Sequence, residues 1–143
     1  VLKKKSRVVF SDIDEIALKQ IKRNLKRNNL KGCRVVKSDV FSNIKGKYDF
    51  IFANPPYISL KRIKRVQKSV LLYEPNKALF GGSDGLFFIK KVLLKTKEHL
   101  TERGVLFLEF DSFQKKEIEN RKGQCFHHCY SIKITCQTGQ KWY

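Results

Sequence analysis

Three short runs of β-branched and aromatic residues, each ending in a polar residue, most strongly constrain the fold of this chain. They are Arg7–Asp12, Cys33–Asp39 and Lys47–Asn54. Runs of this kind are typical of strands that are buried on both faces, as in a parallel sheet. Helical patterns alternate with these strands, and that alternation predicts an α/β fold with layers around a mainly parallel sheet.

The first predicted helix covers residues 14–29. It places Ile16, Ala17, Ile21 and Leu25 on one face, which an amphipathic helix turns toward the core. Acidic residues in the first turn suit the positive end of the helix dipole, and the Asn and Gly residues that follow are typical of a helix end.

The second half of the chain continues this alternation. A helix is predicted for residues 84–100 with Asp84 as its cap, a strand for residues 104–110 and a short helix for residues 112–122. The segments CFHHCYSIKIT and QKWY suggest a closing hairpin. Residues 58–84 show no periodicity beyond one or two helical turns, and a connection of that length is usually functional or mobile.

Asp12, Asp39 and Asn54 end the three predicted strands. Ligands of an open parallel sheet bind outside the carboxyl ends of its strands, so these residues are expected to line one rim. The alternative for any one of them alone is that it marks where a strand reaches water.

A length of 143 residues allows one compact domain, and the formal net charge of +18 favours contact with polyanions such as RNA or a ribosome surface. A general bias toward lysine is the alternative, because the lysines are spread along the chain. No run approaches the roughly 18 apolar residues that a membrane span needs, and no signal-peptide pattern is present, so a cytoplasmic location with reduced cysteines is expected.

The stretch FANPPYIS holds two of the three prolines of the chain. Proline fixes its own φ and restricts the residue before it, so Asn54 and Pro55 have little conformational freedom. The available groups are carbonyl oxygens, the Asn54 side-chain oxygen and the Tyr57 ring and hydroxyl. Such acceptors beside an aromatic plane suit a planar NH₂ group and aim its nitrogen at an electrophile.

This tetrapeptide, NPPY, resembles the fourth motif of class I S-adenosylmethionine-dependent methyltransferases that modify amino groups. The similarity extends over about residues 7–120 and includes VVFSDIDEIALKQIKRN, SDVF, YDFIFANPPYIS, YEPNKALFGGSDGL and GVLFLEF. Their order and spacing are similar to those of the HemK/PrmC family, the release factor glutamine methyltransferases. The resemblance implies a Rossmann-like sheet, S-adenosyl-L-methionine as cofactor and a release factor as partner.

The resemblance also assigns roles to residues. Asp12, with Ile13 beside it, would hold the cofactor's ribose, while Asp39 and Val40 would hold the adenine. Asn54 would lie near the cofactor and, with Pro55, Pro56 and Tyr57, would form the catalytic loop that binds the substrate amide. Two further carboxylates have candidate roles. Glu74 either orients the substrate or braces the loop, or it is a plain surface carboxylate, and Glu109 is expected to support the rim.

One departure from the family pattern concerns the beginning of the chain. The glycine-rich cofactor loop is absent, VLKKKS looks like the end of the helix that would follow it, and the chain has no methionine. Residues 1–143 are therefore expected to be a partial catalytic domain without the family's N-terminal helical domain and first βα unit. The strand of that unit would lie between the strands that end in Asp12 and Asn54. This chain by itself is then expected to bind cofactor poorly.

The sequence contains two smaller clusters of reactive or charged residues. Cys125, His127, His128, Cys129 and Cys136 match neither paired CxxC sites nor a Cys/His finger, so no metal site is expected. The basic run of residues 61–68 follows the NPPY loop and either contacts RNA phosphates or an acidic partner, or is simply a solvated face.

The sequence thus favours a protein methyltransferase that modifies a release-factor glutamine by in-line displacement. A nucleic-acid methyltransferase acting on adenine N6 or guanine N2 is the alternative that the charge supports. A third hypothesis is a basic binding module without catalytic activity.

Overall fold

A computed structural model describes residues 6–125 and 131–137 of the chain. The chain divides into two compact units, residues 1–45 and residues 46–143. The described parts are mixed α/β with parallel sheets, as the sequence predicts. Within them, no helix is long and apolar enough to cross a membrane.

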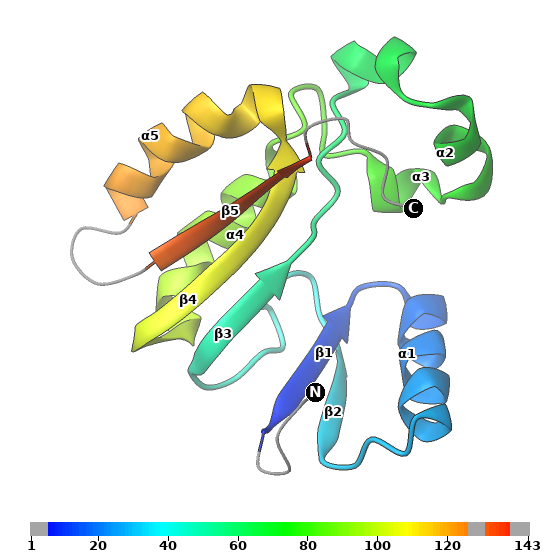
Figure 1. Cartoon of the computed structure of the whole chain (residues 1–143), viewed down its shortest axis with the longest axis vertical. Helices are drawn as coiled ribbons and strands as arrows, with labels where there is room; N and C mark the ends of the chain where they lie inside the picture. The colour runs from blue at the N-terminus through cyan, green and yellow to red at the C-terminus, as the bar shows by residue number, and fades with distance from the viewer. Residues whose placement is uncertain (1–5, 126–130, 138–143) are drawn as a thin grey trace. The chain divides into compact units, whose positions relative to one another are not determined.

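The first unit consists of two parallel strands and one helix (Figure 1). Strand β1 (Val8–Asp12) pairs with β2 (Cys33–Lys37), in a register that sets Val8 opposite Cys33 and Asp12 opposite Lys37. Helix α1 (Glu15–Arg27) connects the two strands. The two strands therefore end at the same edge, where the Ser38 amide donates to the Asp12 carbonyl at 2.9 Å.

Helix α1 begins and ends close to where its sequence predicts. The Asp14 carboxylate accepts a hydrogen bond from the Ile16 amide at 2.8 Å, so Asp14 is the N-cap rather than a first-turn residue. The prediction that Ile16 lies on the inner face is wrong, because Ile16 is 76% exposed whereas Leu18 is 7% exposed. At about 100° per residue, Ile16 lies opposite the stripe formed by Leu18, Ile21 and Leu25.

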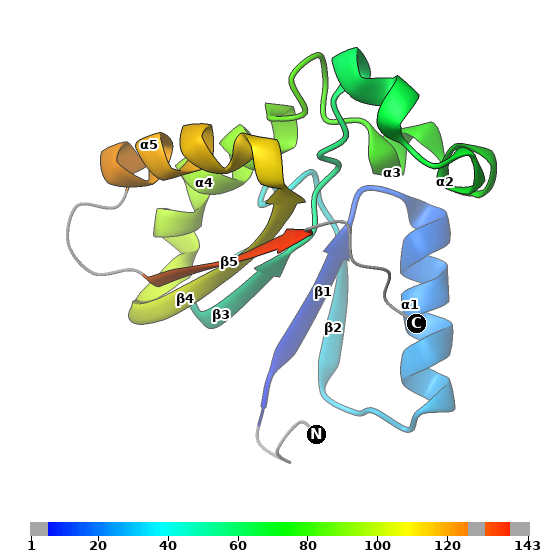
Figure 2. The same cartoon turned by 45° about the horizontal axis from the view of Figure 1, so that its top comes forward.

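The second unit is built on a three-stranded parallel sheet. Its order is β3 (Tyr48–Ala53), β4 (Leu100–Asp111) and β5 (Ser131–Gln137). Helices α4 (Phe87–His99) and α5 (Lys115–Cys125) lie on one face of this sheet (Figures 1 and 2). Side chains of β4 and the two helices form the buried core between them, among them Leu106, Leu108, Phe110, Ile89, Val92, Leu93 and Ile118.

The other face of this sheet carries aromatic side chains near β3. Phe52 stacks on Phe107 with ring centroids 4.7 Å apart, and Phe50 lies 6.4 Å from the same ring. Phe50 and Phe52 are 60% and 75% exposed, so the run that predicts a strand buried on both faces is buried on one face within this unit. Apolar residues fill both faces of β3, but helices cover only one of them here.

The long connection from Ile58 to Asp84 contains more helix than its sequence predicts. It holds a 3₁₀ helix (Leu60–Arg65) and the short helices α2 (Lys68–Tyr73) and α3 (Asn76–Leu79). Its two ends meet in a parallel bridge between Ile58 and Phe80. The connection is therefore a closed loop whose second end returns to the residues that follow the NPPY tetrapeptide.

The end of the chain was predicted as a hairpin. Strand β5, which includes part of the first predicted arm, pairs in parallel with β4, from Val105 opposite Ser131 to Asp111 opposite Gln137. The second predicted arm, residues 140–143, lies outside the described residues. The residues His127, His128 and Cys129 of the Cys/His cluster also lie outside them, so the expectation for that cluster remains a prediction.

Candidate active site

The NPPY loop follows directly from β3. The side chain of Asn54 is exposed and makes no hydrogen bond to any residue that the structure describes. Pro55, Pro56 and Tyr57 are half-buried. The side chain of Asn54 is therefore accessible on a backbone that the two prolines stiffen.

The loop that contains GGSDG, residues 81–85, packs against the backbone of the NPPY loop. A Cβ atom on Gly81 would collide with the Pro56 carbonyl oxygen, and one on Gly85 would collide with the Tyr57 carbonyl oxygen. Gly85 also has a φ of +76°, which disfavours any other residue. The two glycines are therefore required for the close approach of these two backbones.

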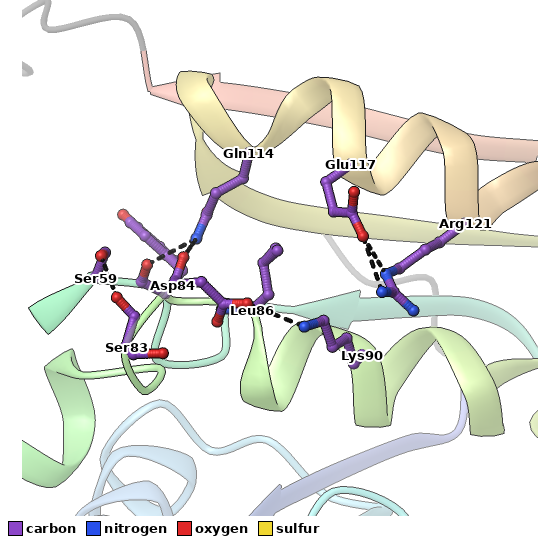
Figure 3. Close-up of polar contacts among 9 residues, drawn as sticks. Ser59, Ser83, Asp84, Leu86, Lys90, Gln114, Glu117 and Arg121 are labelled. Atoms are coloured by element: carbon purple, nitrogen blue, oxygen red, sulfur yellow. Dashed lines mark hydrogen bonds and ion pairs between the residues drawn. The ribbon is translucent and has the colours of Figure 1, made fainter. Parts of the chain in front are cut away.

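Hydrogen bonds join the same two segments beyond the tetrapeptide. The amide of Ile58 donates to the Leu79 carbonyl at 2.9 Å, and the amide of Gly81 donates to the Ile58 carbonyl at 3.0 Å. The hydroxyl of Ser59, a residue only 3% exposed, donates to the Ser83 carbonyl at 2.6 Å (Figure 3). The segment that follows the tetrapeptide is thus fixed by residues more than 20 positions away.

Tyr57 is held at its hydroxyl, which donates to Oε1 of Glu109 on β4 at 3.0 Å. Burial raises the pKa of the Tyr57 phenol, and the hydrogen bond and negative charge of Glu109 raise it further, with smaller contributions from Asp111 and Glu74. The phenol therefore stays neutral, and Glu109 fixes the position of its ring. Glu74 is exposed and lies close enough to Tyr57 to act on it electrostatically.

The predicted cofactor residues lie in the first unit. Asp12, at the end of β1, accepts a hydrogen bond at Oδ1 from the Asp14 amide at 2.8 Å, which leaves the carboxylate with a further oxygen. Ile13 is 59% exposed beside it. This arrangement orients the half-buried Asp12 carboxylate and presents an apolar side chain next to it.

The loop after β2 holds Asp39 and Val40. Val40 adopts a φ of +54°, which is rare for a β-branched residue, and Asp39 is exposed. The hydroxyl of Ser38, a residue 3% exposed, donates to the Val40 carbonyl and accepts from the Asn43 amide, both at 3.0 Å. Strain of this kind persists where the surrounding bonds enforce it, and it is concentrated at functional sites.

Sequence reasoning missed two of the buried polar residues that shape these loops, Ser38 and Gln114. Ser38 stands in the stretch SDVF, of which only Asp39 and Val40 have a predicted role. Gln114 falls within the helix predicted for residues 112–122 and has no predicted role. A polar residue next to an apolar run was the only signal for either.

Comparison with known protein families matches residues 1–89 to the model of the methyltransferase small domain. The chain belongs to this family.

Similar curated proteins are glutamine methyltransferases. The release factor glutamine methyltransferase of Thermodesulfovibrio yellowstonii is 36% identical over 110 residues, which are 76% of this chain and 39% of that protein. The enzyme of the same name from Borreliella burgdorferi is 35% identical over 133 residues, 90% of this chain and 45% of the relative. The ribosomal protein uL3 glutamine methyltransferase of Francisella tularensis is 36% identical over 109 residues, 75% of this chain and 34% of the relative.

These similarities confirm the resemblance to the HemK/PrmC family that the motifs indicate. The chain spans less than half the length of these curated relatives.

Proposed function

We propose that the protein to which this methyltransferase-family chain belongs transfers a methyl group from S-adenosyl-L-methionine to the side-chain amide of a glutamine in a peptide release factor. The observation that carries the proposal is the exposed Asn54 amide on a rigid NPPY loop, without a partner among the described residues. Relatives named as release factor glutamine methyltransferases support the choice of substrate. A cytoplasmic location, as the sequence suggests, is consistent with this function.

The cofactor residues are proposed from the donor set of the first unit. A half-buried Asp12 carboxylate, anchored through one oxygen, is a charged acceptor suited to ribose hydroxyls. Asp39 would accept from the exocyclic amine of adenine, with Ile13 and Val40 as apolar contacts. The types of these residues fit S-adenosylmethionine, and when bound this cofactor supplies an electrophilic methyl group on a sulfonium sulfur.

The NPPY loop would act on the substrate amide. An amide nitrogen is a weak nucleophile because its lone pair is delocalised, so its position and its electrostatic surroundings determine the rate. Asn54 Oδ1 and the Pro55 carbonyl would accept the two N–H groups, direct the nitrogen toward the methyl group and stabilise the positive charge that develops on it. Pro56 keeps the loop rigid, and the Tyr57 ring, fixed by Glu109, would lie against the plane of the amide.

The experiment uses the full-length gene product and labelled S-adenosylmethionine. Release factor, ribosomal proteins and RNA are offered in separate reactions, and the labelled product is identified by mass. The proposal expects label on a glutamine of the release factor. Label on a ribosomal protein and not on the release factor would show that the proposed substrate is wrong. Label on RNA alone would refute the proposal in favour of a nucleic-acid methyltransferase. The absence of label on every substrate would favour a binding module.

An Asn54→Ala variant tests the residue that carries the proposal. Loss of a donor or acceptor that acts at the reacting centre typically lowers kcat about 100-fold or more, so we expect a loss of activity of that size, far larger than any loss of cofactor affinity. Asn120→Ala is the matched control, because Asn120 is an exposed asparagine of α5 outside the loop. Equal activity of the two variants would end the proposed role of Asn54.

A further inference from the structure

Gln114 lies between two loops and the end of strand β4. It is in a short 3₁₀ helix (Ser112–Gln114) that precedes α5, and it is 1% exposed. Its side-chain nitrogen donates to the Tyr57 carbonyl at 3.0 Å and to the Asp84 carbonyl at 3.2 Å. Its side-chain oxygen accepts from the Asp111 amide at 3.0 Å, and Figure 3 shows the side chain pointing toward the Asp84 loop.

These three hydrogen bonds require a side chain with two donor hydrogens and one acceptor oxygen, which an uncharged amide provides. The NH₂ group has two hydrogens, and each is used on a different loop, while the oxygen accepts from Asp111, the last residue of β4 and the N-cap of the 3₁₀ helix. A carboxylate of the same shape accepts only, so Glu would face two carbonyl oxygens without a proton to give them. An apolar side chain would take this hydrogen-bond partner away from two half-buried carbonyls and one half-buried amide.

One of the two carbonyls that accept from Gln114 belongs to Tyr57, the last residue of the NPPY tetrapeptide. Gly85 lies so close to this carbonyl and to the Gln114 nitrogen that a Cβ atom there would be 2.5 Å from that nitrogen. The Pro56 carbonyl is packed in the same way against Gly81. Both carbonyls that follow the substrate-binding residues are therefore fixed by contacts from outside the tetrapeptide.

We propose that Gln114 is a positioning residue for methyl transfer: its buried amide fixes the Tyr57 carbonyl and thereby the orientation of the NPPY loop toward the substrate amide. This inference rests on the function proposed above. The two prolines restrict the shape of the tetrapeptide, but they do not fix its orientation relative to the sheet. Gln114 supplies that constraint from 57 residues further along the chain.

The test uses two variants of the full-length protein, Gln114→Leu and Gln114→Glu. A displacement of about 1 Å at a reacting centre costs on the order of 100-fold in rate, so we expect Gln114→Leu to lower kcat by about that factor. The affinity for S-adenosylmethionine is expected to stay within a few-fold, since the residues proposed to bind the cofactor lie mainly in the first unit. A kcat within about threefold of the wild type, in a folded variant, would overturn the proposal.

The Gln114→Glu variant adds a pH readout that a purely structural role would not produce. A buried carboxyl group protonates more easily than an exposed one, and in its neutral form it regains one donor hydrogen. The ratio of its kcat to that of the wild type is therefore expected to rise as pH falls. Gln20→Glu, at an exposed glutamine of α1, is the control and is expected to show a flat ratio. A flat ratio for Gln114→Glu as well would contradict the proposed hydrogen bonding.

Hydrogen exchange separates this inference from the proposed function. In both Gln114 variants, faster exchange is expected for the amides of Ile58 and Gly81, which join the two loops. Unchanged exchange there would refute the bracing role whatever the enzyme methylates. If the wild type fails to methylate glutamine amides, the proposed function fails, and the exchange result still decides whether Gln114 holds the loop.

Discussion

The loop after β2 and the loop after β3 both carry candidate site residues at strand ends, but they are held in different ways. The first, residues 38–43, is closed by its own hydrogen bonds, which centre on the buried hydroxyl of Ser38. The second, residues 54–60, is stiffened by prolines and then held by Gly81, Gly85 and Gln114. Local bonds shape the first loop, and contacts with distant residues orient the second.

This difference agrees with the tasks proposed for the two loops. A loop that contacts a cofactor needs a defined local shape, and strain at one residue is enough to set it. A loop that directs a nucleophile must in addition be oriented relative to the rest of its unit, because small displacements have large effects on rate. Substitutions that disturb the second loop are therefore expected to speed hydrogen exchange in distant segments as well. Substitutions that disturb the first loop are expected to speed exchange only in that loop.

The largest effect is expected from Gly85→Ala. The new Cβ would collide with the Tyr57 carbonyl and the Gln114 nitrogen, and the residue would also be strained at its positive φ. Together overpacking and strain cost about 3 kcal/mol or more. Hydrogen exchange should show faster opening of residues 57–61 and 81–87 together.

Gly46→Ala is the matched control for Gly85→Ala. Gly46 also has a positive φ, +91°, but a Cβ there would meet nothing within 4 Å. This variant should cost only the strain, about 1–2 kcal/mol. Equal losses in the two variants would show that the close approach of the two loops contributes nothing.

An intermediate effect is expected from Ser38→Ala. It leaves the Asn43 amide and the Val40 carbonyl without their buried partner, which costs about 1–3 kcal/mol. The faster exchange should be confined to residues 38–44. Ser11→Ala, at an exposed serine of β1 in the same unit, should change little. Effects that reach the second unit would contradict the contrast between the two loops.

The difference between local and distant contacts also explains what the sequence could predict. The order of strands and helices and the two ends of α1 depend on residues a few positions apart, and the sequence predicts them close to where they occur. The hydrogen bond from Gln114 to the Tyr57 carbonyl joins residues 57 positions apart, and no periodicity or spacing in the sequence predicts such a pair. The prediction for Ile16 is wrong because, at about 100° per residue, a stripe that holds Ile21 and Leu25 turns Ile16 to the opposite side of the helix.

A smaller effect, of opposite sign, is expected from Val40→Asn. Asparagine tolerates the left-handed region better than a β-branched residue does. The free energy of local opening around residue 40, measured by hydrogen exchange, should therefore rise by about 1 kcal/mol in the variant. The reverse change is available in the same unit, because Asn29 has a φ of +50°. Asn29→Val should lose a similar amount. A loss of stability in Val40→Asn would mean that the packing of the valine outweighs the strain of its backbone.

The smallest effect on stability is expected from the charge of Asp84, whose carbonyl accepts a hydrogen bond from Gln114. The hydrogen bond from the Leu86 amide lowers the pKa of this carboxyl, and the hydrogen bond and charge of Lys90 lower it further. A folded-state pKa below the unfolded value of 3.8 stabilises the fold above that pH, and the stabilisation is lost as pH falls through the folded-state pKa. The N-cap of α4 is Leu86, so the prediction that Asp84 caps this helix is wrong. The Asp84 carboxylate is 46% exposed, so the ion pair adds little, and the hydrogen bond from the Leu86 amide supplies most of the effect, about 0.5–1 kcal/mol. The free energies of unfolding of Asp84→Ala and wild type in urea should therefore differ by this amount near neutral pH and converge in acid.

The control is Asp84→Asn, which keeps an acceptor for the Leu86 amide but has no charge. Its free energy of unfolding should lie between those of the other two proteins, with a weaker dependence on pH. A constant difference between wild type and Asp84→Ala down to acid pH would show that the charge of Asp84 does not stabilise the start of α4.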